Sequence, residues 1–492
     1  MTETAKKKRG MPSSFTILLA LLAIVAVITV IVSGTSGGEV TAARLSDFCT
    51  APILGFADAL PVCLFVMILG GFLGMMTETG ALDNGIAVLV QKLKGNEIML
   101  VPVLMLIFSL GGTTYGMCEE TVPFYALLAA TMMAAGFDPM VGAATVLLGA
   151  GCGCLGSTVN PFAVGAAVDA LTGVDIAVNQ SIIIGLGGVL WLVTTVMSIV
   201  FVMNYAKKVK ADKGSTILSM QELEDAEAAH GKAASEVNKE VKLTGRQKGV
   251  LIAFAFTFVV MIVGFIPLAD LNEGVANFFD AGAVYDADGN TVVQGWSALI
   301  TGLPIGQWYF DEASTWFFLM AILIGIIGGL SEKQIVNTFI TGAADMMSVV
   351  LVIALARGIS VLMASTGLDV YVLDAAANAL AGLSGVIFAP MSFLVYFGLS
   401  FLIPSTSGMA TVSMPIMGPL AVKLGFSPEV MVMIFSAAIG VVNLFTPTSG
   451  AIMGGLALAK IEWTTWLKFA LKLIVALSVV CAVILTIACV ML

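Results

Sequence analysis

The chain has 492 residues, of which 59% are hydrophobic and 11% are charged. A water-soluble domain carries about 25% charged residues, so this composition excludes a mainly soluble chain. The formal net charge of −10 says little about partners, because most of the acids fall between apolar runs. Apolar runs long enough to cross a bilayer recur throughout, and the sequence predicts an all-α polytopic membrane protein with about 10–11 membrane segments.

Histidine and cysteine usage argues against most cofactor chemistry. His230 is the only histidine, which disfavours histidine metal sites and proton relays. The seven cysteines are scattered, and Cys152 and Cys154 lack the spacing of a zinc or redox pair. No G-x-x-x-x-G-K-[ST] loop occurs, which argues against ATP-driven transport. We therefore expect no cofactor, with Na⁺ or H⁺ as the candidate coupling ion.

The chain begins with a basic tail, residues 1–10, which contains four consecutive Lys or Arg residues. The apolar run 15–33 is longer than the apolar part of a usual signal peptide, and no clean A-x-A site follows it, so we predict a retained first helix. Loops rich in Lys and Arg stay on the cytoplasmic side, which places the N-terminus inside. Lys92 and Lys94 place the next inner loop on the same side.

The first transmembrane half, residues 11–205, holds two interrupted segments. Residues 97–135 contain two apolar arms of about 13–15 residues around a polar break, and each arm is too short to cross about 30 Å of hydrocarbon. A re-entrant hairpin that enters and leaves from the inside fits this pattern. Residues 139–170 then form an apolar helix with a break in its middle.

Residues 206–249 form a linker with nine Lys or Arg and seven Asp or Glu. We predict that this linker is cytoplasmic and mobile or loosely helical. The second transmembrane half, residues 250–492, contains a loop at 267–312 with seven acidic residues and no Lys or Arg, as expected on the outside. This half also contains a second hairpin at 384–424 and a second broken helix at 428–459.

The two halves contain one segment twice. Residues 109–167 and 400–457 each show an apolar run, a polar break, a second run, a G-F-x-P turn and a long helix with another break. Residues 76–80 likewise match residues 363–367, and the distribution of basic residues places the first motif inside and the second outside. The pattern predicts inverted repeats, an architecture of secondary transporters whose site lies near the midplane between the repeats.

The polar breaks supply candidate binding residues, because backbone groups freed at membrane depth persist only when they are buried in protein or face a water-filled cavity. A kink with local repair by Ser or Thr is the simpler interpretation of one break, but four paired breaks favour a site. The substrate-binding candidates in the breaks are Thr113 and Thr114 (break 111–116), Ser157, Thr158 and Asn160, Ser405, Thr406 and Ser407, and Asn443, Thr446, Thr448 and Ser449. The candidate Na⁺ ligands are Ser157, Asn160, Asn443 and Thr446.

Glu119 and Glu120 lie at the first break, where the second hairpin has no acid. Carboxylates inside a membrane are costly and mark ion, proton or ligand sites. We predict that at least one of them faces the cavity and binds substrate. The alternative is that one Glu caps the second arm of the hairpin and only structures it.

Arg357 is the only Lys or Arg in residues 334–422, and its counterpart in the first half is about Gly70. The planar guanidinium of an arginine suits a carboxylate, so Arg357 is also a substrate-binding candidate. The alternative is an internal ion pair. The acids considered for that pair are Glu119, Glu120 and Asp345.

Three motifs carry a resemblance to a known family. The G-M-x-E-E-T-x-P-F hairpin at 116–124, the P-S-T-S-G-M-A hairpin at 404–410 and the A-R-G-I-S stretch at 356–360 resemble the YfcC-like branch of the C4-dicarboxylate anaerobic carrier family. The resemblance implies the fold of the ion transporter superfamily, a homodimer, and a scaffold with a mobile part that contains both hairpins. It also implies exchange or cation coupling, in a multi-pass protein of the bacterial inner (plasma) membrane.

We predict a transporter of a small charged solute, not an enzyme and not a nucleic-acid-binding protein. The family suggests C4-dicarboxylates or basic amino acids. A dicarboxylate calls for two positive anchors, and only Arg357 is cationic at depth, although helix dipoles could supply the second. An amino acid calls for one anion site and one cation site, so we favour arginine/ornithine-type exchange or ion-coupled uptake, with a C4-dicarboxylate carrier as the alternative. An intramembrane hydrolase is a distant alternative, since no nucleophile with a base is evident. A passive channel is the other distant alternative.

Overall fold

The structure is a computed structural model that describes residues 14–82, 84–85, 88, 96–236, 242–266, 268, 273–286 and 291–492. The basic tail at 1–10 and the inner-loop residues Lys92 and Lys94 lie outside the described residues. Within the described ranges, nine helices are long and apolar enough to cross a membrane. The chain is an all-α polytopic membrane protein, as its composition predicts, with one short two-stranded sheet beside the helices.

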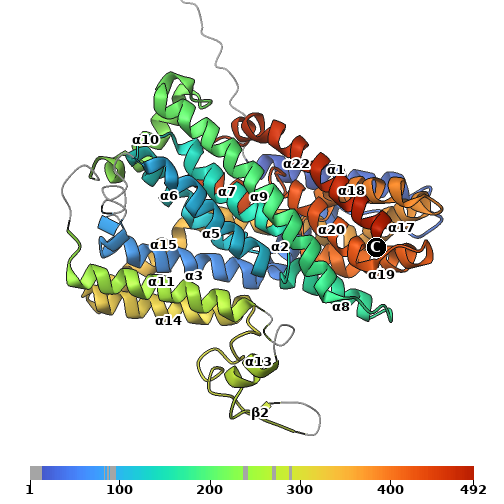
Figure 1. Ribbon diagram of the computed structural model, residues 1–492, viewed down its shortest axis with the longest axis horizontal. Coiled ribbons are helices and arrows are strands. Elements are labelled where there is room, and N and C mark those ends of the chain that lie inside the picture. The colour runs from blue at the N-terminus through green and yellow to red at the C-terminus, as the bar shows by residue number, and fades with distance from the viewer. Residues whose placement is uncertain are drawn as a thin grey trace, which may run out of the picture.

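The helices follow the predicted order in both halves (Figure 1). The first half comprises α1 (Ser14–Ser33), α2 (Leu45–Asp58), α3 (Leu60–Glu78), η1 (Glu97–Met99), α5 (Leu100–Tyr115), η2 (Glu119–Thr121), α6 (Val122–Ala134), α7 (Pro139–Leu155), the π-helix η3 (Pro161–Gly165), α8 (Ala166–Thr172) and α9 (Gln180–Ala211). The linker contains η4 (Lys213–Ser215) and α10 (Met220–Glu236). The second half comprises α11 (Gly245–Phe265), α13 (Glu273–Phe279), β1 (Val284–Tyr285), β2 (Thr291–Val293), α14 (Phe310–Gly328), α15 (Glu332–Asp345), α16 (Met347–Thr366), α17 (Leu368–Leu380), α18 (Gly385–Leu402), α19 (Thr406–Lys423), α20 (Pro428–Val442), α21 (Gly450–Leu458) and α22 (Trp463–Met491).

The repeated G-F-x-P motif ends one helix and starts the next in both halves. Gly136 after α6 and Gly425 after α19 have φ of 86° and 82°, a left-handed conformation that glycine adopts without strain. Asp138 and Ser427 then cap α7 and α20, because their side chains accept hydrogen bonds from backbone N–H groups of the first turn. A proline at the first helical position completes each start.

Two helix pairs pack against each other in the same way in the two halves. Helices α2 and α15 each have 14 residues, and α2 packs against α16 while α3 packs against α15. A Cβ on Gly55 would lie 2.3 Å from the backbone nitrogen of Gly358, and a Cβ on Gly342 would lie 2.4 Å from the carbonyl oxygen of Gly70. In the register set by the matched motifs at 76–80 and 363–367, Gly55 corresponds to Gly342, so the two crossings are equivalent. Glycine at these positions lets the backbones touch.

The first arm of the first hairpin is longer than the predicted length of about 13–15 residues, and the first arm of the second hairpin has a similar length. Helix α5 with its preceding turn has 19 residues and α18 has 18, and both belong to the helices that could cross a bilayer. The predicted break at 111–116 is wrong, because α5 continues to Tyr115 and ends at Gly116, whose φ is 79°. Gly112 serves close packing instead, since a Cβ there would lie 2.2 Å from the Ala150 carbonyl oxygen. The re-entrant path of the hairpins stays a prediction.

Both long broken helices have their freed carbonyl groups satisfied by side chains. In the first half, Thr113 Oγ1 donates to the Gly156 carbonyl at 2.6 Å. In the second half, Trp466 Nε1 donates to the Leu444 carbonyl at 2.9 Å, and Trp463 Nε1 donates to the next carbonyl at 2.7 Å. These side-chain donors help the breaks to persist inside an apolar body, because they satisfy carbonyl groups that the helices leave open.

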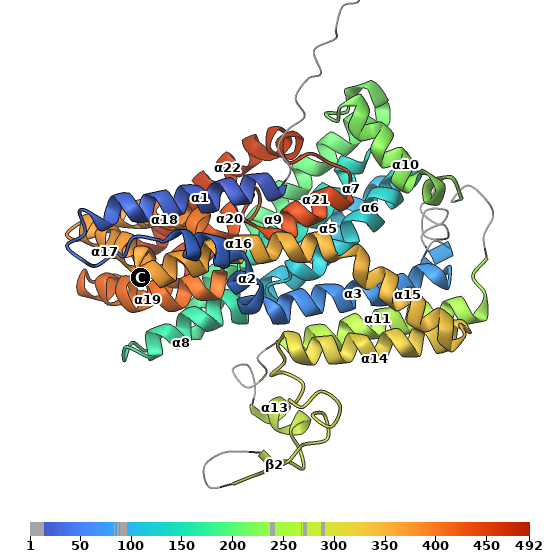
Figure 2. The ribbon, with the colours of Figure 1, turned by 180° about the vertical axis from the view of Figure 1, so that it is seen from behind.

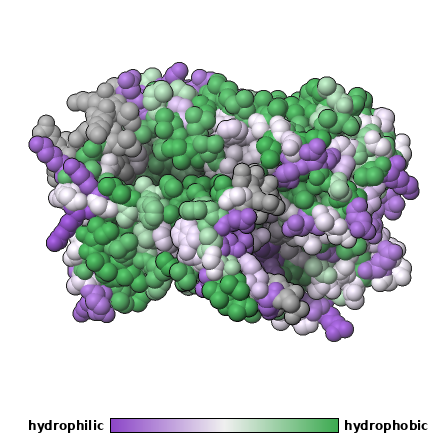
Figure 3. All heavy atoms as spheres, turned by 60° about the horizontal axis from the view of Figure 1, so that its bottom comes forward, coloured by the Kyte–Doolittle hydropathy of each residue, from purple (hydrophilic) through white to green (hydrophobic). Residues whose placement is uncertain are grey.

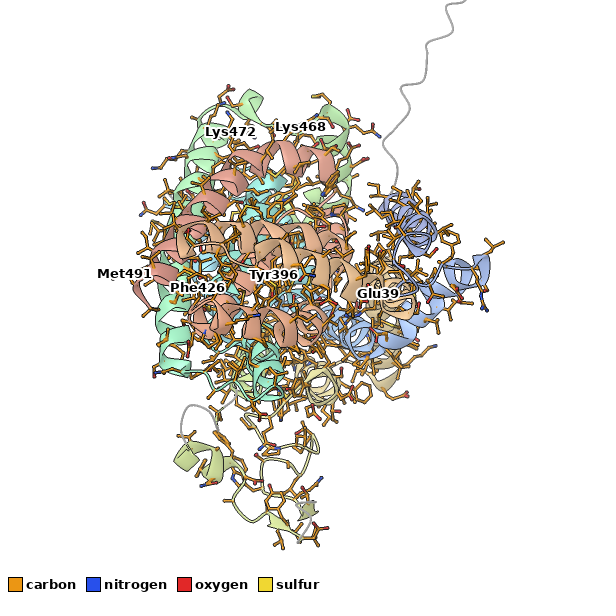
Figure 4. All side chains as sticks on the ribbon, turned by 90° about the vertical axis from the view of Figure 1, so that its right-hand side faces the viewer. Glu39, Tyr396, Phe426, Lys468, Lys472 and Met491 are labelled. Atoms are coloured by element: carbon orange, nitrogen blue, oxygen red, sulfur yellow. The ribbon has the colours of Figure 1, made fainter. Side chains whose placement is uncertain are left out.

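The second hairpin is closed by a buried aromatic layer. Tyr396 of α18 is buried, and its hydroxyl donates to Ser413 Oγ of α19 at 3.2 Å. The Phe388 and Phe426 rings stack 4.8 Å apart between their centroids. Figure 4 shows Tyr396 within the bundle and Phe426 toward the end of α22 that carries Met491. The Tyr396 bond links α18 to α19, and the Phe388–Phe426 contact links α18 to the turn after α19, while the break at 403–405 lies between the two helices.

The described part of the charged linker, which was predicted to be mobile or loosely helical, contains a helix that packs on the bundle. Helix α10 lies at one edge of the bundle, and the region of α13, β1 and β2 projects from the opposite edge (Figure 2). Glu222 is 4% exposed, and its carboxylate accepts a hydrogen bond from the backbone N–H of Glu462 at 2.9 Å. His230 Nε2 lies 3.1 Å from the Leu458 carbonyl oxygen. The linker helix therefore joins α6 of the first half to the end of α21 in the second.

The surface agrees with a membrane location. Figure 3 shows apolar side chains over broad areas of one face, with polar side chains in smaller groups among them. Exposed aliphatic side chains recur along the outer sides of several helices that could span the bilayer. Examples are Ile24 and Val27 in α1, Leu192 and Val196 in α9, Ile252 and Val259 in α11, and Val479 and Val483 in α22. Such apolar exposure suits contact with lipid and would be unusual in a soluble protein.

Candidate functional site

A cavity of about 170 Å³ lies where both hairpin tips and both helix breaks meet α3 and α16. Ten of the fifteen predicted binding residues line it. They are Glu119, Glu120, Asn160, Arg357, Ser405, Thr406, Ser407, Asn443, Thr448 and Ser449. Residues more than 200 positions apart thus face one space, as the paired breaks predict.

The other five predicted residues lie behind the cavity wall. Thr113 is buried and bonded to the α7 break, and Thr158 Oγ1 donates to the Thr113 carbonyl at 3.0 Å. Thr114 Oγ1 donates to the Leu110 carbonyl within its own helix at 2.6 Å. Ser157 donates to the Cys154 carbonyl, and Thr446 Oγ1 lies 2.7 Å from Thr448 Oγ1. Except for Thr114, these hydroxyl groups bond at the two helix breaks, and the cavity is lined by their neighbours.

The acidic side of the cavity comes from the tip of the first hairpin. Glu119, Glu120 and Thr121 form the single turn η2 before α6. Glu120 is 1% exposed, and its Oε2 accepts a hydrogen bond from the Cys118 backbone N–H at 3.0 Å. Glu119 is half-buried and makes no salt bridge with any described residue. The two carboxylates therefore differ: Glu120 is held by the turn, whereas Glu119 is the more open to a ligand.

The cationic side of the cavity is Arg357 in α16. Its Nε lies 2.9 Å from Asp58 Oδ2 at the end of α2, with 24% of the arginine side chain and 52% of the aspartate side chain exposed. The internal partner is thus Asp58, and the predicted candidate Asp345 was wrong because it ends α15 at the other crossing. Asp58 could have been found from the sequence, since it occupies in α2 the place that Asp345 occupies in α15.

Three helix starts also open onto the cavity. Ser405 caps α19 through its hydroxyl, which accepts from the Gly408 N–H at 3.1 Å. Ser449 precedes α21 without a side-chain cap, and residues 450–452 of the first turn line the cavity. Asn160 Oδ1 accepts from the Phe162 and Ala163 N–H groups at 2.9 and 3.3 Å. The positive ends of α19 and α21 therefore face the same space as Arg357 and favour an anionic group there.

The four predicted Na⁺ ligands are not all in one place. Asn160 Nδ2 donates to Ser157 Oγ at 2.9 Å, which joins the two residues of the first break. Asn443 lines the cavity from the second break, while Thr446 is buried beside Thr448. Among the described residues no group of three or more His, Cys, Asp or Glu could hold a metal ion. A Na⁺ site made of amide, hydroxyl and carbonyl oxygens stays a prediction.

Several cavity residues were missed because they carry no local signal. Cys154 of α7 and Ser436 of α20 lie in unbroken helical sequence, where only the fold brings them to the cavity. The sequence likewise does not distinguish three aromatic cavity residues from core residues, namely Tyr125, Phe162 and Phe310. Cys118 precedes the acidic pair and could have been included with it. All six line the cavity.

The fold and the cavity are those of a membrane carrier, and comparison with known proteins identifies the family. Residues 38–490 match the C4-dicarboxylate anaerobic carrier family, DcuC, so the chain belongs to that family. The chain is a transporter of this type, as the sequence motifs predict.

Two relatives in well-studied bacteria are similar over most of their length. An "Uncharacterized protein" of Haemophilus influenzae is 29% identical over 443 residues, which cover 90% of this chain and 78% of the relative. The Escherichia coli K12 protein named "Putative basic amino acid antiporter YfcC" is 27% identical over 440 residues, which cover 87% of this chain and 77% of the relative.

Two solved transporter structures are also similar in outline. Neisseria gonorrhoeae MtrF, described within a class of antimetabolite efflux pumps, is 17% identical with a TM-score of 0.47, covering 98% of this chain and 96% of that chain. The Alcanivorax borkumensis YdaH transporter is 16% identical with a TM-score of 0.46, covering 96% of this chain and 97% of that chain.

Proposed function

We propose that the protein is a secondary active transporter of an amino acid with a basic side chain, by exchange or by ion-coupled uptake. The observation that carries the proposal is the balance of charge around the cavity. Glu119 and Glu120 line it, and the one cationic side chain among its described lining residues, Arg357, already pairs with Asp58. A solute that brings its own positive charge offsets this acidic excess, whereas a dicarboxylate adds to it.

The solute would lie between two chemically different walls. Its carboxylate would face Arg357 and the first turns of α19 and α21, where the guanidinium and the helix dipoles favour an anion. Its amino groups would face the tip of the first hairpin, where Glu119 is open to the cavity. The hydroxyl groups of Thr406 and Ser407 and the amide of Asn443 would supply further hydrogen bonds. The name of the Escherichia coli relative agrees with this class of substrate.

The second candidate is a C4-dicarboxylate, and one observation favours it. Two helix starts, those of α19 and α21, open onto the cavity together with Arg357, which provides more than one place for a carboxylate. In this case Glu119 and Glu120 would have to be protonated or paired with a coupling cation. The family name supports this alternative.

The transport mechanism is proposed on the same basis. Equivalent glycine crossings at Gly55 and Gly342 support two inverted repeats, with hairpins that re-enter the membrane and a cytoplasmic N-terminus and linker. The protein would work as a homodimer in the bacterial inner membrane, with Na⁺ or H⁺ as the coupling ion. Separate Na⁺ and pH gradients in a transport assay distinguish these two ions.

An uptake screen in proteoliposomes tests the proposal. Labelled basic, neutral and acidic amino acids and C4-dicarboxylates are offered with and without a Na⁺ gradient and a pH gradient. We expect the basic amino acids to be accumulated or exchanged, and the dicarboxylates to be excluded. Accumulation of dicarboxylates alone would replace the first candidate by the second, and equal flux of all solutes without coupling would indicate a passive channel.

A further inference from the structure

A second cavity of about 870 Å³ lies beside the first, on the side of the molecule that carries the linker. Its wall includes His230 of α10 and Lys460 after α21, and the acids Glu78 and Asp345. It is polar enough at its rim to hold a charged, hydrated solute. The two cavities have no lining residue in common.

A small apolar cluster lies between the two cavities. It is separate from the main core and consists of nine buried residues: Ala59, Cys63, Val66, Val122, Met346, Val349, Val350, Ile353 and Ala451. Val66, Val122 and Val350 are fully buried, and Val349 is 1% exposed. Some of its members line the first cavity, and Met346 lines the second, so the cluster touches both.

The same three features follow one another along α3 and α16, two of the four helices that build the cluster. In α3, Val62 lines the first cavity, Val66 belongs to the cluster and Gly70 lines the second cavity. In α16 the order along the chain is reversed, since Ser348 lines the second cavity and Arg357 the first, with the cluster residues between them.

Helices α6 and α21 complete the layer on its other side. Val122 of α6 belongs to the cluster and is followed by Pro123, which lines the second cavity. In α21, Ala451 belongs to the cluster and lines the first cavity, and Leu458 lines the second. Helices α3 and α16 therefore pass from one cavity to the other through a single apolar layer, to which α6 and α21 each contribute one buried residue.

The layer lies between two sets of helices that are joined only by packing. Helix α3 packs on α15 and α16 packs on α2, whereas α6 and α21 pack against each other. Among the described residues, no hydrogen bond or salt bridge joins α6 or α21 to α3 or α16. Gly450 and Gly454 of α21 lie directly on Ile353 and Val349 of α16, where an added Cβ would come within 2.3 and 2.7 Å of those side chains. An apolar contact without directional bonds can slide with little cost, because no bond has to break first.

We propose that this apolar layer is the closed gate of the transport path, and that the larger cavity is the vestibule through which the solute leaves on the linker side. The inference rests on the proposed transport function. A constriction of Val66, Val122 and Val349 side chains excludes water and ions, as apolar constrictions do in channels. Movement of α6 and α21 along α3 and α16 would carry the first cavity past this layer and open it into the vestibule.

Val349→Ser tests the gate, because it wets the centre of the layer while removing little volume. Efflux of labelled arginine from loaded proteoliposomes, with no solute outside, should rise several-fold in Val349→Ser. The matched control is Val352→Ser in the same helix, which is also buried but lies in the main core and lines neither cavity. Val349→Ile keeps the layer apolar and should keep efflux at the level of the unchanged protein.

A labelling arm works without knowing the solute. A water-soluble thiol reagent is added on the side that carries α10, and modification of each cysteine is read by mass spectrometry. A cysteine at the vestibule position, Ser348→Cys, should react at once, and the native Cys118 in the first cavity should react several-fold faster when Val349→Ser is added. Reaction of Cys118 in the unchanged protein at the rate of the Ser348→Cys thiol would overturn the gate.

The two arms separate the gate from the function. If no offered solute is transported but the labelling changes as expected, the proposed solute is wrong and the gate stands. If the unchanged protein transports arginine but Val349→Ser alters neither efflux nor the labelling of Cys118, the gate is wrong and the function stands. A Val352→Ser variant that leaks as much as Val349→Ser also contradicts the gate, because a polar residue anywhere in α16 would then raise efflux.

Discussion

The two equivalent helix crossings have the same close backbone approach and different side chains. At one crossing, where α2 meets α16, Asp58 pairs with Arg357 beside the first cavity. At the other, where α3 meets α15, the equivalent positions are Asp345 and Gly70, and Asp345 makes no salt bridge with a described residue. The same backbone geometry thus occurs twice, and the arginine at one of the two crossings makes that crossing the candidate binding site.

Removing Arg357 should have the largest effect on transport. Arg357→Gln removes a charge-assisted contact to the solute carboxylate of about 1.5–3 kcal/mol, so apparent affinity should fall by about tenfold to a hundredfold. Arg357→Lys should retain more affinity than Arg357→Gln, because it keeps the charge but not the planar geometry. Uptake kinetics of each variant provide the measurement.

Aspartate substitutions at the two crossings sharpen this comparison. Asp345→Asn, at the crossing without arginine, should leave affinity nearly unchanged. The Asp58→Asn, Arg357→Gln double variant separates two roles of the arginine. Recovery of uptake in the double variant would mean that Arg357 only neutralises Asp58, since losing one member of a partly buried pair is worse than losing both. We expect no recovery.

The two glutamates of the first hairpin should differ, because Glu120 is held by a backbone N–H and Glu119 is not held by an ion pair. Glu119→Gln should lower the preference for basic over neutral amino acids by about tenfold, which corresponds to about 1.4 kcal/mol. Glu120→Gln should change selectivity less. Competition of labelled arginine uptake by unlabelled arginine and by a neutral analogue measures the preference. The reverse order of the two variants would contradict the assignment of Glu119 to the solute.

The glycines at the crossings should matter equally for stability in both halves. Gly55→Ala and Gly342→Ala each place a methyl group within 2.4 Å of a backbone atom of the facing helix. Each should lower the free energy of unfolding by about 1–3 kcal/mol, as overpacking does. Gly188→Ala is the matched control, since nothing lies within 4 Å of its added Cβ. Thermal unfolding in detergent gives the comparison, and a stable variant at only one crossing would show that the two are not equivalent.

The smallest expected effect is a pH dependence in the linker. Burial lowers the pKa of His230 from its usual value of 6.5, and the nearby Lys460 adds to this. The docked helix α10 therefore favours neutral His230, and docking should be strongest above about pH 6.5 and weaken as the pH falls below it.

Hydrogen exchange of the α10 amides, corrected for intrinsic rates, tests this dependence. Protection should decrease between about pH 7 and about pH 5.5. A His230→Gln variant is uncharged over this range and serves as the control, so its protection should not change with pH. Equal pH dependence in both proteins would show that another group controls docking.

Much of the architecture could be predicted because the same local sequence patterns occur in both halves. The G-F-x-P turns, the two broken helices and the match between 76–80 and 363–367 are local patterns, and each has a physical cause in a cap, a left-handed glycine or a helix break. Glycines within α5 misled the prediction of the first break, because Gly112 serves close packing with α7 and does not end the helix.

The unpredicted features depend on contacts between distant parts of the chain. The order of the linker helix comes from Glu222 and His230, whose partners lie after α21. The Asp58 partner of Arg357 and the cavity residues Cys154 and Ser436 are positioned by helix crossings that no single segment encodes. The composition of the linker indicates a charged segment, but it does not indicate which helices the linker packs against.

Counterflow in proteoliposomes tests the central claim most directly, because it reports solute exchange through one site. Vesicles are loaded with unlabelled arginine, ornithine, citrulline or succinate, and the entry of external labelled arginine is followed. We expect internal arginine and ornithine to stimulate entry strongly, citrulline weakly and succinate not at all, and we expect Arg357→Gln and Glu119→Gln both to reduce the stimulation. Stimulation of labelled succinate entry by internal succinate, with no exchange of arginine, would contradict transport of a basic amino acid through this site.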